Sequence, residues 1–158
     1  MKLKYCTLEE ETGHEAGRRL LGELYLEETG QALPEIHIGS RGKPYFQDSP
    51  LHFSITHTKK HAFCAISRHS IGIDAEEMDR KISPHLADHV LSPGEKAQYG
   101  QAQDRQKTLL TFWVLKEAQA KLTGEGLRGY PNHTDFTLPS KAVREIDGCL
   151  LAILEEKD

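Results

Sequence analysis

Residues 51–74, with the sequence LHFSITHTKKHAFCAISRHSIGID, decide the fold class of this chain. Apolar and polar residues alternate over the first six positions, which is the period of a strand with one buried face. A second apolar run covers residues 62–67 after a polar break at residues 58–60, and a third covers residues 70–74. Short runs separated by brief polar breaks predict adjacent strands of an antiparallel sheet.

The sequence on both sides of these strands predicts helices. Apolar residues at the spacing of one helix face favour a helix over residues 13–28, with Gly30 after its end. Further on, Ser92-Pro93-Gly94-Glu95 combines a Ser N-cap, a first-turn Pro and a Glu three residues after the cap, so it marks a helix start. A longer helix is predicted over residues 105–123 and is ended by Gly124.

The rest of the chain adds short strands. Apolar runs predict them over residues 35–39, 135–138, 143–146 and 149–154. Asp147-Gly148 lies between the last two runs and is a strong signal for a hairpin turn. The fold class is therefore predicted to be α+β, with helices packed on antiparallel sheet.

Length and charge limit the classes of function. A chain of 158 residues forms one compact unit, or two small lobes that share a core. Lys and Arg total 20 against 24 Asp and Glu, so no global basic field attracts nucleic acid or an anionic membrane. The N-terminus carries no secretory apolar run, and no stretch approaches the roughly 20 apolar residues of a membrane span.

The chain has three cysteines, Cys6, Cys64 and Cys149. Their odd number, their wide spacing and the absence of a C-x-x-C pair argue against a disulfide framework and against a zinc knuckle. Each lies among apolar neighbours, so we interpret them as core thiols of a protein of the reducing cytosol. The nine histidines show no paired spacing such as H-E-x-x-H, and we predict no zinc site.

Asp74 and Glu76 flank a single residue at the end of an apolar strand. Residues i and i+2 of a strand point to the same side, so the two carboxylates are placed to converge on a hard cation such as Mg²⁺. The alternative is a solvated strand end, which the following Glu77 and Asp79 suit equally well.

Glu117 and Lys121 are four residues apart in the long helix and share one of its faces. A carboxylate and an ammonium in that arrangement suit a metal ion and a phosphate oxygen side by side. The alternative is an exposed ion pair that stabilises the helix by a few tenths of a kcal/mol.

Two weaker signals precede them in the chain. Phe53-Ser54-Ile55-Thr56-His57-Thr58 brings hydroxyls and an imidazole to a strand end, which suits a phosphate, although a structural histidine explains His57 as well. Gly42-Lys43-Pro44 places a cation in a turn. The chain has no G-x-x-x-x-G-K-[ST] loop, no G-x-G-x-x-G and no G-x-S-x-G, so the common phosphate-binding loops and the serine-hydrolase elbow are excluded.

The order of these motifs is more specific than any one of them. G-K-P at residues 42–44 is followed by F-S-x-T-H-T at 53–58, I-G-I-D-x-E at 71–76 and F-W-x-x-K-E-A-x-x-K-x-x-G-x-G-L at 112–127. This series resembles the surfactin-type (Sfp-type) 4′-phosphopantetheinyl transferases, in a short form. The resemblance covers about Glu15 to Leu154, which is most of the chain.

The resemblance implies a pseudo-dimer of two similar lobes, each an antiparallel sheet packed with a long helix, and coenzyme A in the cleft between them. Here the lobes would be residues 1–69, on the 3′-phosphate and adenine side of coenzyme A, and residues 70–158, with the metal and the catalytic residues. The implied reaction moves 4′-phosphopantetheine from coenzyme A to a serine of an apo carrier protein. Its products are the holo carrier protein and 3′,5′-ADP.

The resemblance also implies roles for single residues. Mg²⁺, with Mn²⁺ as an alternative, would be held by Asp74, Glu76 and Glu117. Glu117 would also be a candidate general base, and Lys121 would contact the attacked phosphate. The residues implied for coenzyme A binding are Arg19, Lys43, Pro44, Thr56 and His57.

The chain departs from the family pattern at a few positions. Ser54 stands where the family has Asn, and Thr56 and Thr58 stand where it has Ser, so the hydroxyls are kept at the two Thr positions. Only 13 residues precede His14, whereas longer members carry an additional basic segment there. We therefore expect weaker binding of coenzyme A, or compensation by other side chains.

Two other functions compete with this interpretation. A metal-dependent nuclease would place an E-x-K motif at a strand end, but here the Lys lies four residues beyond Glu117 on a helix and the net charge is −4. A degenerate relative that only binds coenzyme A or a carrier protein would not be expected to keep the metal-binding carboxylates. We expect a cytoplasmic monomer whose partner is an apo acyl or peptidyl carrier protein of unspecified pathway, without nucleic acid or membrane partners.

Overall fold

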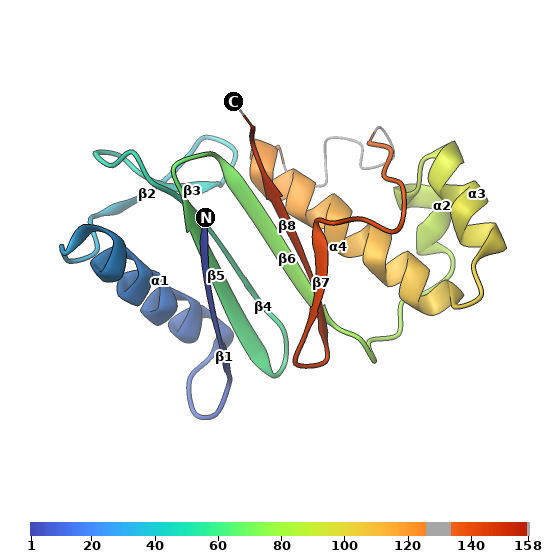
Figure 1. Cartoon of the computed structure of the whole chain (residues 1–158), viewed down its shortest axis with the longest axis horizontal. Coiled ribbons are helices and arrows are strands. Elements are labelled where there is room, and N and C mark those ends of the chain that lie inside the picture. The colour runs from blue at the N-terminus through green and yellow to red at the C-terminus, as the bar shows by residue number, and fades with distance from the viewer. Residues whose placement is uncertain (126–133, 158) are drawn as a thin grey trace.

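Two three-stranded antiparallel sheets form the centre of the structure, a computed structural model that describes residues 1–125 and 134–157 (Figure 1). The first sheet has the order β1-β5-β4 and consists of β1 (Lys2–Thr7), β5 (His61–Ser67) and β4 (His52–His57). The second has the order β6-β8-β7 and consists of β6 (Ile71–Glu77), β8 (Cys149–Glu155) and β7 (Val143–Ile146). A small separate ribbon pairs β2 (Ile36–Ile38) with β3 (Pro44–Phe46).

One long helix accompanies each sheet (Figure 1). Helix α1 (Gly13–Thr29) packs on the first sheet, and α4 (Arg105–Thr123) packs on the second. Two shorter helices, α2 (Leu86–Val90) and α3 (Pro93–Gln101), lie against α4 at the far end of the molecule. The α+β class and the antiparallel sheets predicted from the sequence are confirmed.

The local signals for helix ends and turns are also confirmed. Ser92 and Glu95 form a reciprocal capping box at the start of α3. Helices α1 and α4 end at Gly30 and Gly124, each in the left-handed conformation that glycine adopts without strain. The turn at Asp147-Gly148 has positive φ at both residues and joins β7 to β8 as a hairpin.

The predicted strand over residues 135–138 is wrong. Its backbone pairs with side chains of α3 instead of with another strand. The Phe136 N–H donates to Glu95 Oε2 at 2.7 Å, and the Leu138 N–H donates to Gln98 Oε1 at 2.9 Å. Gln98 Nε2 in turn donates to the Phe136 carbonyl at 2.9 Å. This segment thus passes along a helix without entering a sheet.

Sequence reasoning also missed three short elements, β1, β3 and α2. Strand β1 is the partner of β5 over residues 2–7, and its alternation is too short and too rich in lysine to stand out. Gly126 and Leu127, the last two residues of the fourth motif, lie outside the described residues.

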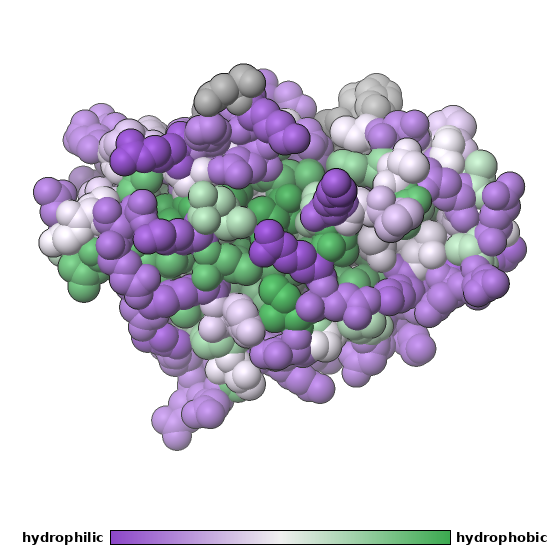
Figure 2. All heavy atoms as spheres, viewed as in Figure 1, coloured by the Kyte–Doolittle hydropathy of each residue, from purple (hydrophilic) through white to green (hydrophobic). Residues whose placement is uncertain are grey.

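Buried side chains form three clusters. The first lies between α1 and the first sheet and includes Leu21 and Phe53. The second lies between α2, α4 and the second sheet and includes Phe112 and Leu115. The third joins β5 of the first sheet to β6 and β8 of the second, through Phe63, Ala65, Ile71, Ile73, Ala75, Cys149 and Leu151. This third cluster makes the two sheets one packed unit. On the surface, apolar residues gather across the middle of the face shown in Figure 2.

The cysteines fit the prediction of core thiols in part. All three are free. Cys64 and Cys149 are buried, whereas Cys6 on β1 is partly exposed.

Side chains rather than backbone link the two sheets where β4 runs beside β6. The Ile73 N–H donates to Ser54 Oγ at 3.0 Å, and the Ala75 N–H donates to Thr56 Oγ1 at 3.3 Å. Strand β6 is the edge of its own sheet, so these hydroxyls satisfy buried donors that would otherwise cost about 1–3 kcal/mol each. The predicted functional division between residues 69 and 70 falls just before β6 and stays a prediction.

Gly72 sets how closely α4 approaches β6. A Cβ atom at this position would lie 2.2 Å from the Ala118 carbonyl oxygen and 2.4 Å from the Leu122 nitrogen. Both are backbone atoms of α4, so neither can move without the helix. The glycine of the I-G-I-D-x-E motif is therefore required for the contact between helix and strand.

No helix in the described part of the chain has the length and apolar character needed to cross a bilayer.

We expect Gly72→Ala to destabilise the fold by at least about 1–3 kcal/mol, because it overpacks a backbone contact. The matched control is Gly22→Ala in the interior of α1, where the new Cβ would have no atom within 4 Å. This control should stabilise the protein by roughly 0.5–1 kcal/mol through helix propensity. Urea unfolding of the two variants measures both effects, and similar free energies of unfolding would contradict the close approach of α4.

Candidate active site

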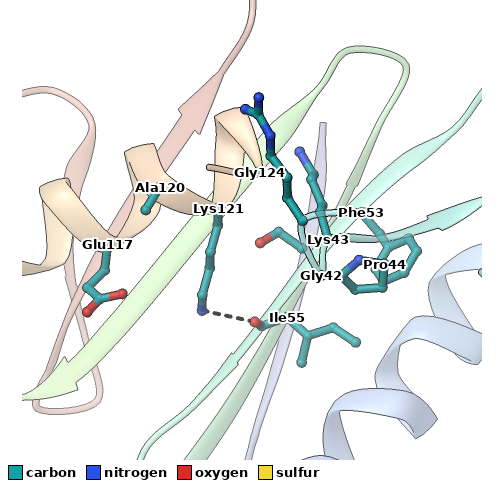
Figure 3. Close-up of a pocket in the computed structure, with 11 residues that line it drawn as sticks. Gly42, Lys43, Pro44, Phe53, Ile55, Glu117, Ala120, Lys121 and Gly124 are labelled. Carbon is teal, nitrogen blue, oxygen red and sulfur yellow. Dashed lines mark hydrogen bonds between the residues drawn. The ribbon is translucent and has the colours of Figure 1, made fainter. Parts of the chain in front are cut away.

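A cavity of about 300 Å³ lies between the two halves of the chain. Its walls come from three segments that are distant in sequence: residues 41–44 before and in β3, residues 53–55 of β4, and the last two turns of α4. Glu117 and Lys121 project from the same side of α4, and the Lys121 ammonium reaches towards Ile55 on β4 (Figure 3). The cavity thus brings together motifs from both halves.

Lys121 connects α4 to both central strands. Its Nζ donates to the Ile55 carbonyl of β4 at 3.2 Å and to Asp74 Oδ1 of β6 at 3.4 Å. Thr56 Oγ1 also donates to Asp74 Oδ1, at 3.3 Å. The other carboxylate oxygen, Asp74 Oδ2, is buried and has no hydrogen-bond partner among the described residues. An unsatisfied buried carboxylate oxygen is costly, which points to a ligand that the protein alone does not supply.

The surroundings of Asp74 change its acidity. Burial raises the pKa of Asp74 to about 7, against a smaller lowering effect of Lys121 and with further raising effects of Glu117 and Glu76. Burial also raises the pKa of Glu117, and Lys121 lowers it while Glu76 raises it. Two carboxylates with raised pKa values beside one ammonium are typical of a functional site.

Glu76 lies on the same side of β6 as Asp74, two residues further on, and forms an ion pair with Arg80. Its carboxylate is therefore turned towards Arg80 and is not gathered with the other two. In residues 1–125 and 134–157, one group of three metal-ligating side chains has all its ligand atoms within 4.8 Å, and it consists of other residues. Even so, the donor set of Asp74, Glu76 and Glu117 fits a hard divalent cation, because Asp74 Oδ2 lacks a partner and carboxylates are the protein ligands that Mg²⁺ uses.

Lys43 and Pro44 line the same cavity from the opposite wall. Lys43 Nζ donates to the Leu122 carbonyl at 2.7 Å and to Ser70 Oγ at 3.2 Å. The ammonium thus binds a carbonyl of the last turn of α4, where a cation is favoured by the helix dipole. Burial lowers the pKa of Lys43, and Glu156 raises it by a smaller amount.

Three of the residues implied for coenzyme A binding do not line this cavity. Arg19 forms ion pairs with Glu11 at 2.8 Å and with Glu23 at 3.1 Å. Thr56 is buried behind the cavity wall, where it contacts Asp74. His57 lines a second, wider hollow at the end of β4, together with Glu76, Arg80 and other residues.

The family model of the 4′-phosphopantetheinyl transferase superfamily matches residues 70–152, more than half of the chain. The chain belongs to this superfamily. Its match begins just before β6 and covers the carboxylates of β6, the whole of α4 and most of β8.

Three bacterial proteins of known function are similar to this chain. The 4′-phosphopantetheinyl transferase gsp of Aneurinibacillus migulanus is 34% identical over 125 residues, which cover 72% of this chain and 51% of the relative. The 4′-phosphopantetheinyl transferase HetI of a Nostoc species is 35% identical over 119 residues, which cover 70% of this chain and 49% of the relative. A 4′-phosphopantetheinyl transferase of Bacillus subtilis is 34% identical over 89 residues, which cover 54% of this chain and 39% of the relative. The chain spans about half the length of the first two and less of the third.

One residue of the motif on α4 has a structural role that the sequence did not reveal. Lys116, next to Glu117, is buried with a side chain that is 0% exposed, and its Nζ lies 2.6 Å from Glu95 Oε1. Glu95 is equally buried and also caps α3. This ion pair fixes α3 against α4 and so orients the helix that carries Glu117 and Lys121. The capping box at Ser92 was visible in the sequence, but the other partners of Glu95, Lys116 and the Phe136 N–H, were not.

The raised pKa of Asp74 gives a test that needs no substrate. The folded-state pKa lies above the ordinary value of 3.8, so the protonated form is favoured by folding. The stability that Asp74 contributes is full below pH 3.8 and is lost as pH rises through 7. With EDTA present, Asp74→Asn should therefore be more stable than the wild type at pH 8, by no more than about 4 kcal/mol, and this difference should shrink towards pH 4.

Thermal and urea unfolding at several pH values measure this difference. The control is Asp79→Asn, three residues beyond Glu76 and exposed, which should change stability by less than about 0.5 kcal/mol at every pH. A pH-independent difference between Asp74→Asn and the wild type would show that Asp74 is not buried in a charge-disfavouring environment.

Proposed function

We propose that this chain transfers 4′-phosphopantetheine from coenzyme A to a serine of an apo acyl or peptidyl carrier protein. The products are the holo carrier protein and 3′,5′-ADP. The observation that carries the proposal is the buried Asp74, which has one unpartnered oxygen among the described residues and is bound by Lys121. Lys121 and Glu117 both line the cavity between the two halves. The similarity to the 4′-phosphopantetheinyl transferases gsp and HetI supports the same activity.

Attack of a serine hydroxyl on a phosphoanhydride needs neutralised phosphate oxygens and an aligned nucleophile, with little covalent chemistry from the protein. Asp74, Glu76 and Glu117 would hold Mg²⁺, or Mn²⁺, which supplies positive charge next to the pyrophosphate. Lys121 is held in place by the Ile55 carbonyl and Asp74, which supports a role for its ammonium in contacting the attacked phosphate oxygen. Such a preorganised cation stabilises the charge that develops in the transition state.

Glu117 is the proposed general base. It is half-buried at the cavity and its pKa is raised by burial, both of which suit a carboxylate that accepts the proton of a serine hydroxyl. The proton acceptor and the cation thus lie one helical turn apart on α4, and the carrier serine would enter between them.

Lys43 and Pro44, across the cavity from Glu117, are proposed to contact the nucleotide end of coenzyme A. A cavity of about 300 Å³ is at the lower end of small-molecule sites, so it holds only part of that ligand. The remainder would extend along the surface, where His57 and Arg19 are proposed to contribute. In this arrangement residues 1–69 bind the nucleotide end and residues 70–158 provide the metal and the catalysis.

The activity is tested by mass spectrometry of apo carrier proteins from fatty-acid, polyketide and peptide synthetases, each incubated with the chain, coenzyme A and Mg²⁺. We expect the mass of phosphopantetheine to be added to at least one carrier and to be lost when EDTA is present. Full transfer in EDTA would remove the metal from the proposal. Absence of transfer to every carrier would favour a relative that binds without catalysis. We expect the active form to be a cytoplasmic monomer.

Substitutions of Glu117 and of Lys121 should have different kinetic effects if both residues are catalytic. Glu117→Gln removes a metal ligand and the base, so kcat should collapse, and added Mg²⁺ should restore it only partly. Lys121→Ala should lower kcat by roughly 10²–10³ with little change in KM for coenzyme A, because its contact strengthens in the transition state. Lys121→Arg should restore little, since a planar guanidinium does not replace a compact ammonium.

Steady-state kinetics on folded variants measure these effects, with melting curves in parallel. The matched control is Lys107→Ala, which removes an exposed ion pair with Glu145 at the other end of α4. This control should keep the wild-type kcat and cost less than about 1 kcal/mol of stability. If Glu117→Gln and Lys121→Ala behave like Lys107→Ala, neither side chain is catalytic and the proposed site is wrong.

A further inference from the structure

A second polar cluster lies on the other face of β6 and takes no part in the proposed reaction. It consists of His61 at the start of β5, Glu77 at the end of β6 and Cys149 at the start of β8. His61 Nδ1 lies 2.8 Å from Glu77 Oε1, and Cys149 Sγ lies 3.3 Å from both His61 Nδ1 and Glu77 Oε2. The three side chains come from three strands and meet in one place.

The cluster is separate from the cavity because side chains alternate along a strand. Asp74 and Glu76 point to one side of β6, and Glu77 points to the other. On that side it continues the apolar cluster that joins the two sheets, directly opposite Cys149 in the β6–β8 pairing. The side chains of His61 and Glu77 are only 9% and 14% exposed, and Cys149 is fully buried.

An imidazole, a carboxylate and a thiol are the ligand types that zinc prefers. Tetrahedral zinc with ordinary bond lengths places such ligand atoms roughly 3.4–3.6 Å apart. Here Cys149 Sγ lies 3.3 Å from His61 Nδ1, and one ligand atom from each of the three residues lies within 4.8 Å of the other two. Small side-chain rotations are therefore enough to admit the ion.

A neighbouring hydroxyl holds the cluster in position. Thr58 Oγ1 donates to Glu77 Oε1 at 2.7 Å, which is the kind of outer contact that orients a ligating carboxylate. Thr58 and Glu77 also line the wide hollow beside β4, from which a water molecule can reach the cluster as a fourth ligand.

The thiol does not suit the alternative role of a catalytic nucleophile. Burial raises the pKa of Cys149 to about 12, and the hydrogen bond to the Glu77 carboxylate and its charge act in the same direction. The thiol therefore keeps its proton at neutral pH unless a cation displaces it.

We propose that His61, Glu77 and Cys149 bind one zinc-type divalent cation, with the fourth position open to the hollow beside Thr58. The ion would link β5 of the first sheet to β6 and β8 of the second, so it would cross-link the two halves of the chain. Binding to the folded state alone would stabilise the fold by mass action. None of the three ligands lines the cavity that Glu117 and Lys121 share, although the hollow beside Thr58 is also lined by Glu76 and His57.

The test uses Co²⁺ as a spectroscopic probe. The full chain is stripped with EDTA, kept reduced with a phosphine, and titrated with Co²⁺ in excess Mg²⁺, which occupies hard carboxylate sites without absorbing light. We expect a thiolate-to-cobalt charge-transfer band in the near ultraviolet that saturates at one equivalent and disappears when Zn²⁺ is added. Zn²⁺ should also raise the melting temperature.

Cys149→Ser should abolish the band, and Cys6→Ser, the control at a partly exposed cysteine, should keep it. His61→Gln leaves the thiol in place and should weaken Co²⁺ binding by at least roughly ten-fold, so the proposal stays testable if Cys149→Ser fails to fold. The proposal is overturned by the absence of a band in the wild type, by a band that survives Cys149→Ser or disappears in Cys6→Ser, or by unchanged affinity in His61→Gln. In those cases the cluster is a hydrogen-bonded core feature. Carrier modification is not measured, so the outcome does not depend on it.

Discussion

The contact between the backbone of α4 and the backbone of β6 at Gly72 is the constraint on which the rest of the structure depends. Since only hydrogen occupies the space next to the Ala118 carbonyl, the helix lies directly on the strand. Glu117 and Lys121 flank that point of contact, and Asp74 follows Gly72 by one step on the same side of the strand. The spacing of the two elements that carry the cation and the carboxylates is therefore fixed by main-chain packing.

Local patterns predicted the elements whose stability is local. The limits of α4, the capping box of α3 and the Asp147-Gly148 hairpin all follow from residues within a few positions of each other. Residues 135–138 have the composition of a strand but no strand to pair with. Their backbone groups find partners in Glu95 and Gln98, about forty residues earlier in the chain, and no sequence period records that arrangement.

The candidate site shows the same limit. Motif order identified Asp74, Glu76, Glu117 and Lys121, and the structure brings Asp74 and Lys121 into contact. It does not place Arg19 or His57 at the cavity, because a resemblance assigns a position in a motif and not a direction for the side chain. The cluster of His61, Glu77 and Cys149 was invisible for a related reason. Its members are 16, 72 and 88 residues apart in pairs, so no short metal-binding spacing exists to be found.

The hydroxyls of Ser54 and Thr56 have a consequence for how the chain avoids association with other chains. Strand β6 is an edge of its sheet, and an open edge with free N–H groups recruits strands from neighbouring molecules. Two side chains of β4 occupy the Ile73 and Ala75 donors and close that edge without extending the sheet. A fragment beginning near residue 70 would expose these donors together with the apolar face of β6. The first half of the chain thus shields this edge of the second from other strands.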